Sequence, residues 1–150
     1  MAYRHTQIGW AMILILGPII ALLVWVATQT GGTGSVVVTG VIALLAVCLV
    51  LFISQTVLVD EQRVEVRAGP GLIHRTVALA DIETVGQQHL PWWAVGFGIR
   101  TSLDGKRQLW RVSGSNVVDL GLSDGRRVLI ATDEPEALAT VVRLATGTTR

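Results

Sequence analysis

Between Arg4 and Asp60 the chain contains no Asp, Glu, Lys or Arg. Two apolar runs, 8–27 and 36–53, occupy most of this uncharged interval. An α-helix rises about 1.5 Å per residue, so a run of roughly 20 apolar residues matches a hydrocarbon core about 30 Å thick. The sequence therefore predicts two transmembrane helices before any motif is considered.

A polar segment without charge, 28–35, joins the two runs. Its length and its glycines suit the connection between two antiparallel helices. Small residues recur at helical spacing, with Gly17 and Ala21 on the first run and Thr39 and Ala43 on the second. Such residues allow close helix contact in lipid, where van der Waals packing drives association. We expect a transmembrane hairpin that packs through these positions, with another subunit as the alternative partner for them.

The distribution of basic residues predicts the orientation of this hairpin. Arg4 precedes the first run, the connection has no Lys or Arg, and three arginines follow the second run at positions 63, 67 and 75. Basic residues flanking membrane helices favour the cytoplasmic side. We therefore expect a multi-pass protein of the cell membrane with both termini in the cytoplasm. A cleaved signal peptide over residues 1–27 is the competing interpretation.

The remainder of the chain, 56–150, has a different composition. It holds all eleven acidic residues and every basic residue except Arg4, so its formal charge is zero. This balance argues against nucleic-acid binding. We expect two units: a helical hairpin over residues 1–55 and one cytoplasmic domain over residues 56–150.

The periodicity of the second unit predicts strands followed by a helix. Apolar and polar residues alternate in short runs separated by turn signals such as Ser123-Asp124-Gly125, which indicates seven or eight strands. Asp133 then starts a helical pattern as an expected N-cap, with Glu136 three residues later and Gly147 at the end. The predicted fold class is thus an α+β membrane protein.

Four segments carry a resemblance to a known family. They are Leu79-Ala80-Asp81-Ile82-Glu83-Thr84-Val85, Pro91 with Gly96-Phe97-Gly98-Ile99-Arg100, the run 120–128, and the closing run 132–138. In their order the chain resembles bacterial pleckstrin-homology-like (PH-like) domains that follow a pair of membrane helices, a type common in actinobacteria. The resemblance implies a bent β-barrel of two sheets and about seven strands, capped by a C-terminal helix and used as a binding scaffold.

The resemblance does not extend to a phosphoinositide site. Family members that bind phosphoinositide headgroups use basic residues around the first hairpin of the domain, whereas the corresponding turn here is Asp60-Glu61-Gln62. Two carboxylates repel a phosphorylated headgroup. We therefore do not expect phosphoinositide-type recognition.

Catalytic and metal chemistry find no support in the sequence. The three histidines are scattered, and the single cysteine, Cys48, lies inside the second apolar run. A zinc site needs such ligands at close spacing, and a nucleophilic enzyme needs a presented nucleophile with a base nearby. We expect no metal, no cofactor and no enzymatic activity.

Two groups of residues are candidates for contact with a membrane surface or a protein partner. The first is the adjacent pair Trp92 and Trp93, which need a core, bilayer or partner surface to cover them. The second is a basic group formed by Lys106, Arg107 and Arg111, with positions 126 and 127 as possible neighbours. Each such cation adds about 1 kcal/mol near anionic lipid. A solvated strand edge is the alternative interpretation for the basic group.

These inferences lead to one expected function and one alternative. We expect a non-enzymatic integral membrane protein that presents a PH-like binding or assembly module at the cytoplasmic face. A protein partner or self-association would accompany the lipid bilayer, without nucleic acid. The alternative is an accessory subunit of a membrane transport or envelope-synthesis complex that contacts partner helices through the hairpin.

Overall fold

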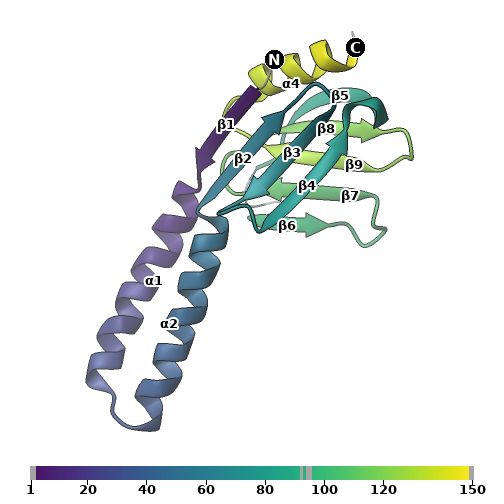
Figure 1. Cartoon of the computed structure of the whole chain (residues 1–150). Helices are drawn as coiled ribbons and strands as arrows, with labels where there is room; N and C mark the ends of the chain where they lie inside the picture. Colours follow the sequence, from purple (N-terminus) through teal and green to yellow (C-terminus); the bar gives the residue numbers. More distant parts are fainter. Residues whose placement is uncertain (1–2, 92, 94–95, 149–150) are drawn as a thin grey trace.

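In the computed structural model, two long helices project from a body of two β-sheets (Figure 1). The structure describes residues 3–91, 93 and 96–148. The strands are β1 (Tyr3–Ile8), β2 (Ser54–Val59), β3 (Arg63–Ala68), β4 (Ile73–Ala78), β5 (Ile82–His89), β6 (Gly98–Thr101), β7 (Arg107–Arg111), β8 (Asn116–Leu122) and β9 (Arg127–Ala131). The helices are α1 (Trp10–Gln29), α2 (Thr33–Phe52), the short η1 (Leu79–Asp81) and α4 (Pro135–Thr146).

The helical hairpin is inserted between two adjacent strands of one sheet. β1 pairs antiparallel with β2, with Tyr3 opposite Val59 and Ile8 opposite Ser54. The sequence predicts no strand over this N-terminal segment, and the first predicted span begins at Ile8. The strand was missed because its stability comes from pairing with residues about fifty positions away, which local periodicity does not show.

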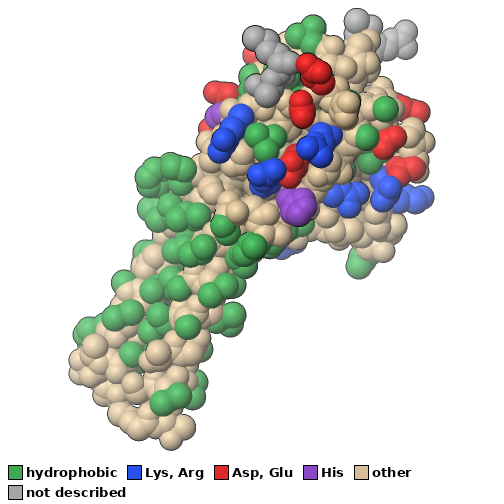
Figure 2. Space-filling model, viewed as in Figure 1, with side chains coloured by type: hydrophobic (Ala, Val, Ile, Leu, Met, Phe, Trp, Pro, Cys, Tyr) green, Lys and Arg blue, Asp and Glu red, His purple; other side chains and the backbone are tan. Residues whose placement is uncertain are grey.

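Both helices are long and apolar enough to cross a membrane, and none of their residues is buried. Figure 2 shows hydrophobic side chains along the hairpin, with Lys, Arg, Asp and Glu confined to the β-rich body. At the hairpin tip both helices include polar residues. The loop between α1 and α2 is therefore shorter than the gap between the predicted spans 8–27 and 36–53. An apolar surface on all sides of a helix is typical of a helix surrounded by lipid.

The two helices pack through larger side chains than the sequence analysis expected. The partly buried positions on α2 follow alternating steps of three and four residues. They include Ser35, Val38, Ile42, Leu45 and Leu49. Gly17 is partly buried, but Ala21, Thr39 and Ala43 are exposed. The contact between α1 and α2 therefore does not include these three residues, which lie outside the covered face of each helix.

The main core lies between the two sheets. The first sheet has the order β1-β2-β3-β4 and the second β5-β8-β9-β7-β6, in which only the β7–β9 pair is parallel. Valines of the first sheet face Trp110, Val118, Leu120 and Ile130 of the second, and α4 contributes Leu138 and Val142. The structure confirms the α+β class, the two sheets and the C-terminal helix.

A seven-stranded bent barrel is not what the described residues form. They make nine strands in two separate sheets. The strand that the sequence did not predict is β1, which the segment before the hairpin supplies. The β6–β7 hairpin joins the second sheet through the parallel β7–β9 contact. Parallel pairing requires a crossover between distant segments, so turn signals alone do not reveal it.

Buried amides fasten the strands next to the hairpin to the second sheet. Gln7 and Gln55 face each other across β1 and β2, and their exposed fractions are 5% and 1%. Both side-chain amides donate to the carbonyl of Ala131, at 2.9 and 3.2 Å. The Gln7 side-chain oxygen also accepts from the amide of Asp133 at 3.1 Å. Because buried polar groups are costly unless paired, these bonds fix the two sheets relative to each other.

The start of α4 differs from the predicted capping box. The N-cap residue is Glu134, and it makes no side-chain capping bond. Asp133 instead accepts from His5 on β1, with 2.6 Å between the His5 Nε2 and Asp133 Oδ1 atoms. The carboxylate thus serves the contact between β1 and α4. The predicted end is confirmed, because Gly147 adopts a left-handed conformation with φ 68°.

Candidate functional site

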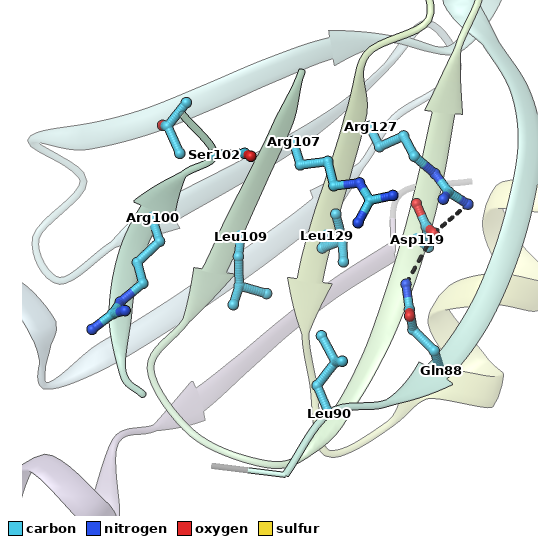
Figure 3. A pocket seen from close by; sticks show the side chains of 10 residues that line it. Gln88, Leu90, Arg100, Ser102, Arg107, Leu109, Asp119, Arg127 and Leu129 are labelled. Carbon is cyan, nitrogen blue, oxygen red and sulfur yellow. Dashed lines mark hydrogen bonds and ion pairs between the residues drawn. The ribbon is translucent and has the colours of Figure 1, made fainter. Parts of the chain in front are cut away.

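The candidate site is a cavity of about 450 Å³ on the face of the second sheet that points away from the main core (Figure 3). Its floor is apolar. Leu109 and Leu129 lie directly opposite each other on β7 and β9, and Leu90 packs beside them. These residues belong to a small apolar cluster that is separate from the main core. The second sheet is therefore apolar on both faces over part of its area.

Three arginines surround the floor. Arg100 on β6 is opposite Leu109, and Arg107 on β7 is opposite Arg127 on β9. All three line the cavity. The register of β7 and β9 thus places two positive charges side by side at the edge of the cavity. Like charges directly across a strand pair repel each other.

Asp119 on β8 neutralises part of this charge from inside the cavity. Its exposed fraction is 4%. The Oδ2 atom accepts from the Arg127 guanidinium at 2.6 Å and from the Gln88 side-chain amide at 3.0 Å. The Oδ1 atom is buried and has no partner in the part of the chain that the structure describes. The cavity lining thus contains one carboxylate and three guanidinium groups.

Arg111 does not belong to the exposed basic group that the sequence predicted. Its side chain is fully buried, and its guanidinium donates to the carbonyls of Leu90 and Pro91. Burial lowers the pKa of this guanidinium, but an arginine in a protein stays protonated. Arg111 is on the same outer face of β7 as Arg107, as strand alternation predicts. It is buried because it lies at the end of β7 that the segment after β5 covers.

The other predicted site residues have separate positions. Arg107 lines the cavity, while Lys106 lines a smaller hollow beside it with Arg75 and Arg126. Trp93 is 75% exposed, which excludes core packing and leaves the membrane surface and a partner as interpretations. Trp92 lies outside the described residues. The tryptophan of the main core is Trp110, with 3% exposure.

Arg100, Asp119 and the apolar floor were not predicted as parts of a site from the sequence. The alternation Arg107-x-Leu109 and Arg127-x-Leu129 places each arginine on the same face as a leucine. What joins the two pairs is the parallel contact between β7 and β9, across a sequence separation of twenty residues. That contact is a tertiary feature with no local signal.

The residues that line the cavity offer groups that can bind a ligand. Among the described residues, no group of three or more His, Cys, Asp or Glu side chains is placed to hold a metal ion. The cavity residues supply guanidinium groups, one paired carboxylate, hydroxyls at Thr101 and Ser102, and leucine side chains. Guanidinium forks recognise carboxylates and phosphates, and the leucines accept apolar groups.

Comparison with known proteins adds no further assignment: no family model, no curated protein and no solved structure matches this chain.

Proposed function

We propose that this protein is a non-enzymatic, membrane-anchored binding module, in which the helical hairpin holds the β-rich body at the cytoplasmic face. The observation that carries the proposal is the insertion of α1 and α2 between the paired strands β1 and β2. Neither helix is linked to the sheets by a flexible tether, since a single residue separates β1 from α1 and a single residue separates α2 from β2. The anchor therefore sets the position of the sheets.

The surface of the hairpin supports a lipid environment. Large apolar side chains on both helices are exposed, among them Leu14, Leu22 and Leu44 at 71%, 59% and 63%. Exposed apolar area costs about 25 cal/mol per Å² in water. Trp10 and Trp25 are exposed at 62% and 61% near opposite ends of α1. Indole rings favour the two membrane–water boundaries, so their spacing fits a spanning helix.

Topology and charge together support the proposed orientation. Both ends of the hairpin continue into the same sheet, so the N-terminal strand and the β-rich body share one side of the membrane. The tip between α1 and α2 has no Lys or Arg, while the body carries all of them. The positive-inside tendency places the body in the cytoplasm.

The resemblance to PH-like domains supports a binding role in this proposal. The two stacked sheets and the closing helix α4 agree with the scaffold that the resemblance implies. The Asp60-Glu61-Gln62 turn joins β2 to β3, and the connection between β1 and β2 is the helical hairpin itself. Headgroup binding of the phosphoinositide type at the first strand connection is therefore not part of the proposal.

One observation favours the second candidate function, an accessory subunit of a membrane transport or envelope-synthesis complex. Thr39 and Ala43 are exposed on the hairpin, and no described atom other than those of its own turn lies near an added Cβ at Gly40. Small exposed residues on a lipid-facing helix permit the close approach of a foreign helix. Ala43→Leu would then reduce the recovery of co-purifying membrane proteins.

Cysteine labelling tests the anchor and its orientation. The native Cys48 is replaced by alanine, and single cysteines are placed at Thr30 in the tip or at Arg63 on β3. In intact bacterial spheroplasts, a membrane-impermeant maleimide should label the Thr30 position, and the Arg63 position should react only after lysis. The protein should also stay in the membrane fraction after carbonate washing. Labelling of the Arg63 position in intact spheroplasts, or release by carbonate, would contradict the proposal.

A further inference from the structure

The charge of the cavity is not balanced by the chain itself. Asp119 pairs with Arg127, and the structure shows no hydrogen bond or ion pair of the Arg100 or Arg107 side chain with any described residue. The lining carries three arginines and one aspartate, which leaves a formal excess of two positive charges. Neutral leucine side chains beneath these groups reduce the local dielectric response, so the attraction for an anion is stronger than on an open surface.

The positions of these groups define the shape of a ligand. Arg107 and Arg127 are opposite each other at one end of the floor, and Leu90 lies at the other end (Figure 3). Leu109 and Leu129 lie between the two ends. A ligand whose anionic group lies at Arg107 and Arg127 would therefore place its apolar part over Leu109 and Leu129. A volume of about 450 Å³ is in the range of sites for small molecules, and too small for a folded partner domain.

We propose that this cavity binds a small anionic amphiphile, a carboxylate or phosphate group carried on a short apolar body. The anion is held by the Arg107 guanidinium group beside Arg127, which Asp119 keeps in place (Figure 3). The apolar body covers Leu109 and Leu129. The inference deepens the proposed binding function by naming its ligand class, and it does not depend on which side of the membrane the cavity faces.

Hexyl phosphate is a suitable probe because it combines both features, and the full chain in a nonionic detergent is the protein to test. Calorimetric titration should show saturable binding of hexyl phosphate. Methyl phosphate, which lacks the apolar body, and hexanol, which lacks the charge, should each bind at least tenfold more weakly. Equal affinity for hexyl phosphate and hexanol would overturn the proposal, as would the absence of saturable binding at millimolar concentration.

Charge-removing variants assign the binding to the cavity. Arg107→Gln should weaken hexyl phosphate binding about tenfold or more, and Arg100→Gln should weaken it less, because the Arg100 guanidinium points away from Arg107 and Arg127 (Figure 3). Arg63→Gln removes the same charge from an exposed position on the first sheet and should leave the affinity unchanged. Because Arg100 and Arg107 are exposed, their variants should keep the melting temperature of the parent, which separates lost binding from lost folding. Undiminished binding in the double variant would place the ligand elsewhere and refute the proposal.

Reconstitution in nanodiscs distinguishes the two sources of such an anion. If the natural ligand is a lipid headgroup, discs with phosphatidylglycerol should weaken hexyl phosphate binding relative to phosphatidylcholine discs, by direct competition. If the natural ligand is a soluble metabolite, both discs should give the same affinity. Either result preserves the cavity as an anion site, and the cysteine labelling experiment reports separately on the anchor.

Discussion

The backbone amide of Gly9 donates a hydrogen bond to the carbonyl of Ile53, with 2.7 Å between nitrogen and oxygen. This bond joins the residue before α1 to the residue after α2, so it closes the base of the hairpin where the helices leave the sheet. The space around Gly9 is filled. An added Cβ atom would lie 2.6 Å from the Val112 Cγ1 atom and 2.9 Å from the Phe52 carbonyl oxygen.

Gly9→Ala should therefore destabilise the protein although the backbone conformation permits alanine, since φ is −77°. The added methyl group forces a shift of Val112 or of the end of α2, with an expected cost of about 1–3 kcal/mol in the free energy of unfolding. Thermal denaturation in detergent, followed by circular dichroism, measures the loss. Gly17→Ala is the matched control, because no described atom lies within 4 Å of an added Cβ there. A lower melting temperature for Gly17→Ala than for Gly9→Ala would contradict this account.

Arg111→Met is expected to loosen the segment after β5 without a large change in global stability. The substitution removes the hydrogen bonds to the Leu90 and Pro91 carbonyls. A hydrogen bond from a charged donor contributes about 1.5–3 kcal/mol to stability. It also removes a buried charge, whose desolvation costs several kcal/mol. The two effects change the free energy of unfolding in opposite directions, but only the lost hydrogen bonds act on the segment after β5 itself.

Hydrogen exchange measured by mass spectrometry checks this expectation. Peptides that contain residues 90 and 91 should exchange faster in Arg111→Met than in the parent, while peptides from β2 and β3 stay protected. Arg107→Met changes an exposed arginine of the same strand and should leave all these peptides unchanged. Unaltered exchange in the peptides that contain residues 90 and 91 would show that Arg111 does not hold this segment.

Much of the fold could be predicted because its signals are local. The uncharged interval gives the two helices, alternation and turn residues give the strands from β2 onward, and Gly147 gives the end of α4. β1 could not be found in this way. Its six residues become a strand only through pairing with β2, on the far side of the hairpin.

The candidate site was less accessible to sequence reasoning for the same physical reason. Arg107 was identified, but as part of a group with Arg111, since both are basic residues on one predicted strand. Strand alternation puts them on the same face, and burial then separates them: Arg107 is exposed and Arg111 has 0% exposure. The residues that line the cavity together with Arg107 include residues of β6, β8 and β9, and these strands meet only after the sheet has formed.

The hairpin contact offers a comparison between neighbouring residues on α2. Ile42 is partly buried and Ala43 is exposed. Ile42→Ala removes dispersion contacts with α1 and should destabilise the hairpin by about 1 kcal/mol. Ala43→Leu should leave the stability unchanged, because the new side chain extends away from α1. Thermal melts in detergent measure both effects, and a greater loss in Ala43→Leu would show that Ala43 lies in the contact after all.

Tyr3 provides a titration that reports on the contact between β1 and α4. Its hydroxyl donates to the Glu134 carboxylate at 3.2 Å. Burial, followed by the negative charge of Glu134 and this hydrogen bond, raises the pKa of Tyr3 from 10.0 to about 12. The folded state thus holds the proton more tightly than the unfolded state. The stabilisation is present below pH 10 and is lost as the pH rises towards 12.

Tyr3 is the only tyrosine of the chain, so the ultraviolet absorbance of tyrosinate follows this one group. In the folded protein the midpoint of the titration should lie near 12, and in denaturant it should fall to the ordinary value of about 10. Glu134→Gln should lower the folded midpoint only in part, because burial is the larger cause and remains in the variant. His5→Ala, which removes a neighbouring contact to Asp133 and Glu134, tests whether the ring stays seated between β1 and α4. A folded midpoint near 10 in the parent would mean that the ring is solvated and that β1 does not pack against α4 in solution.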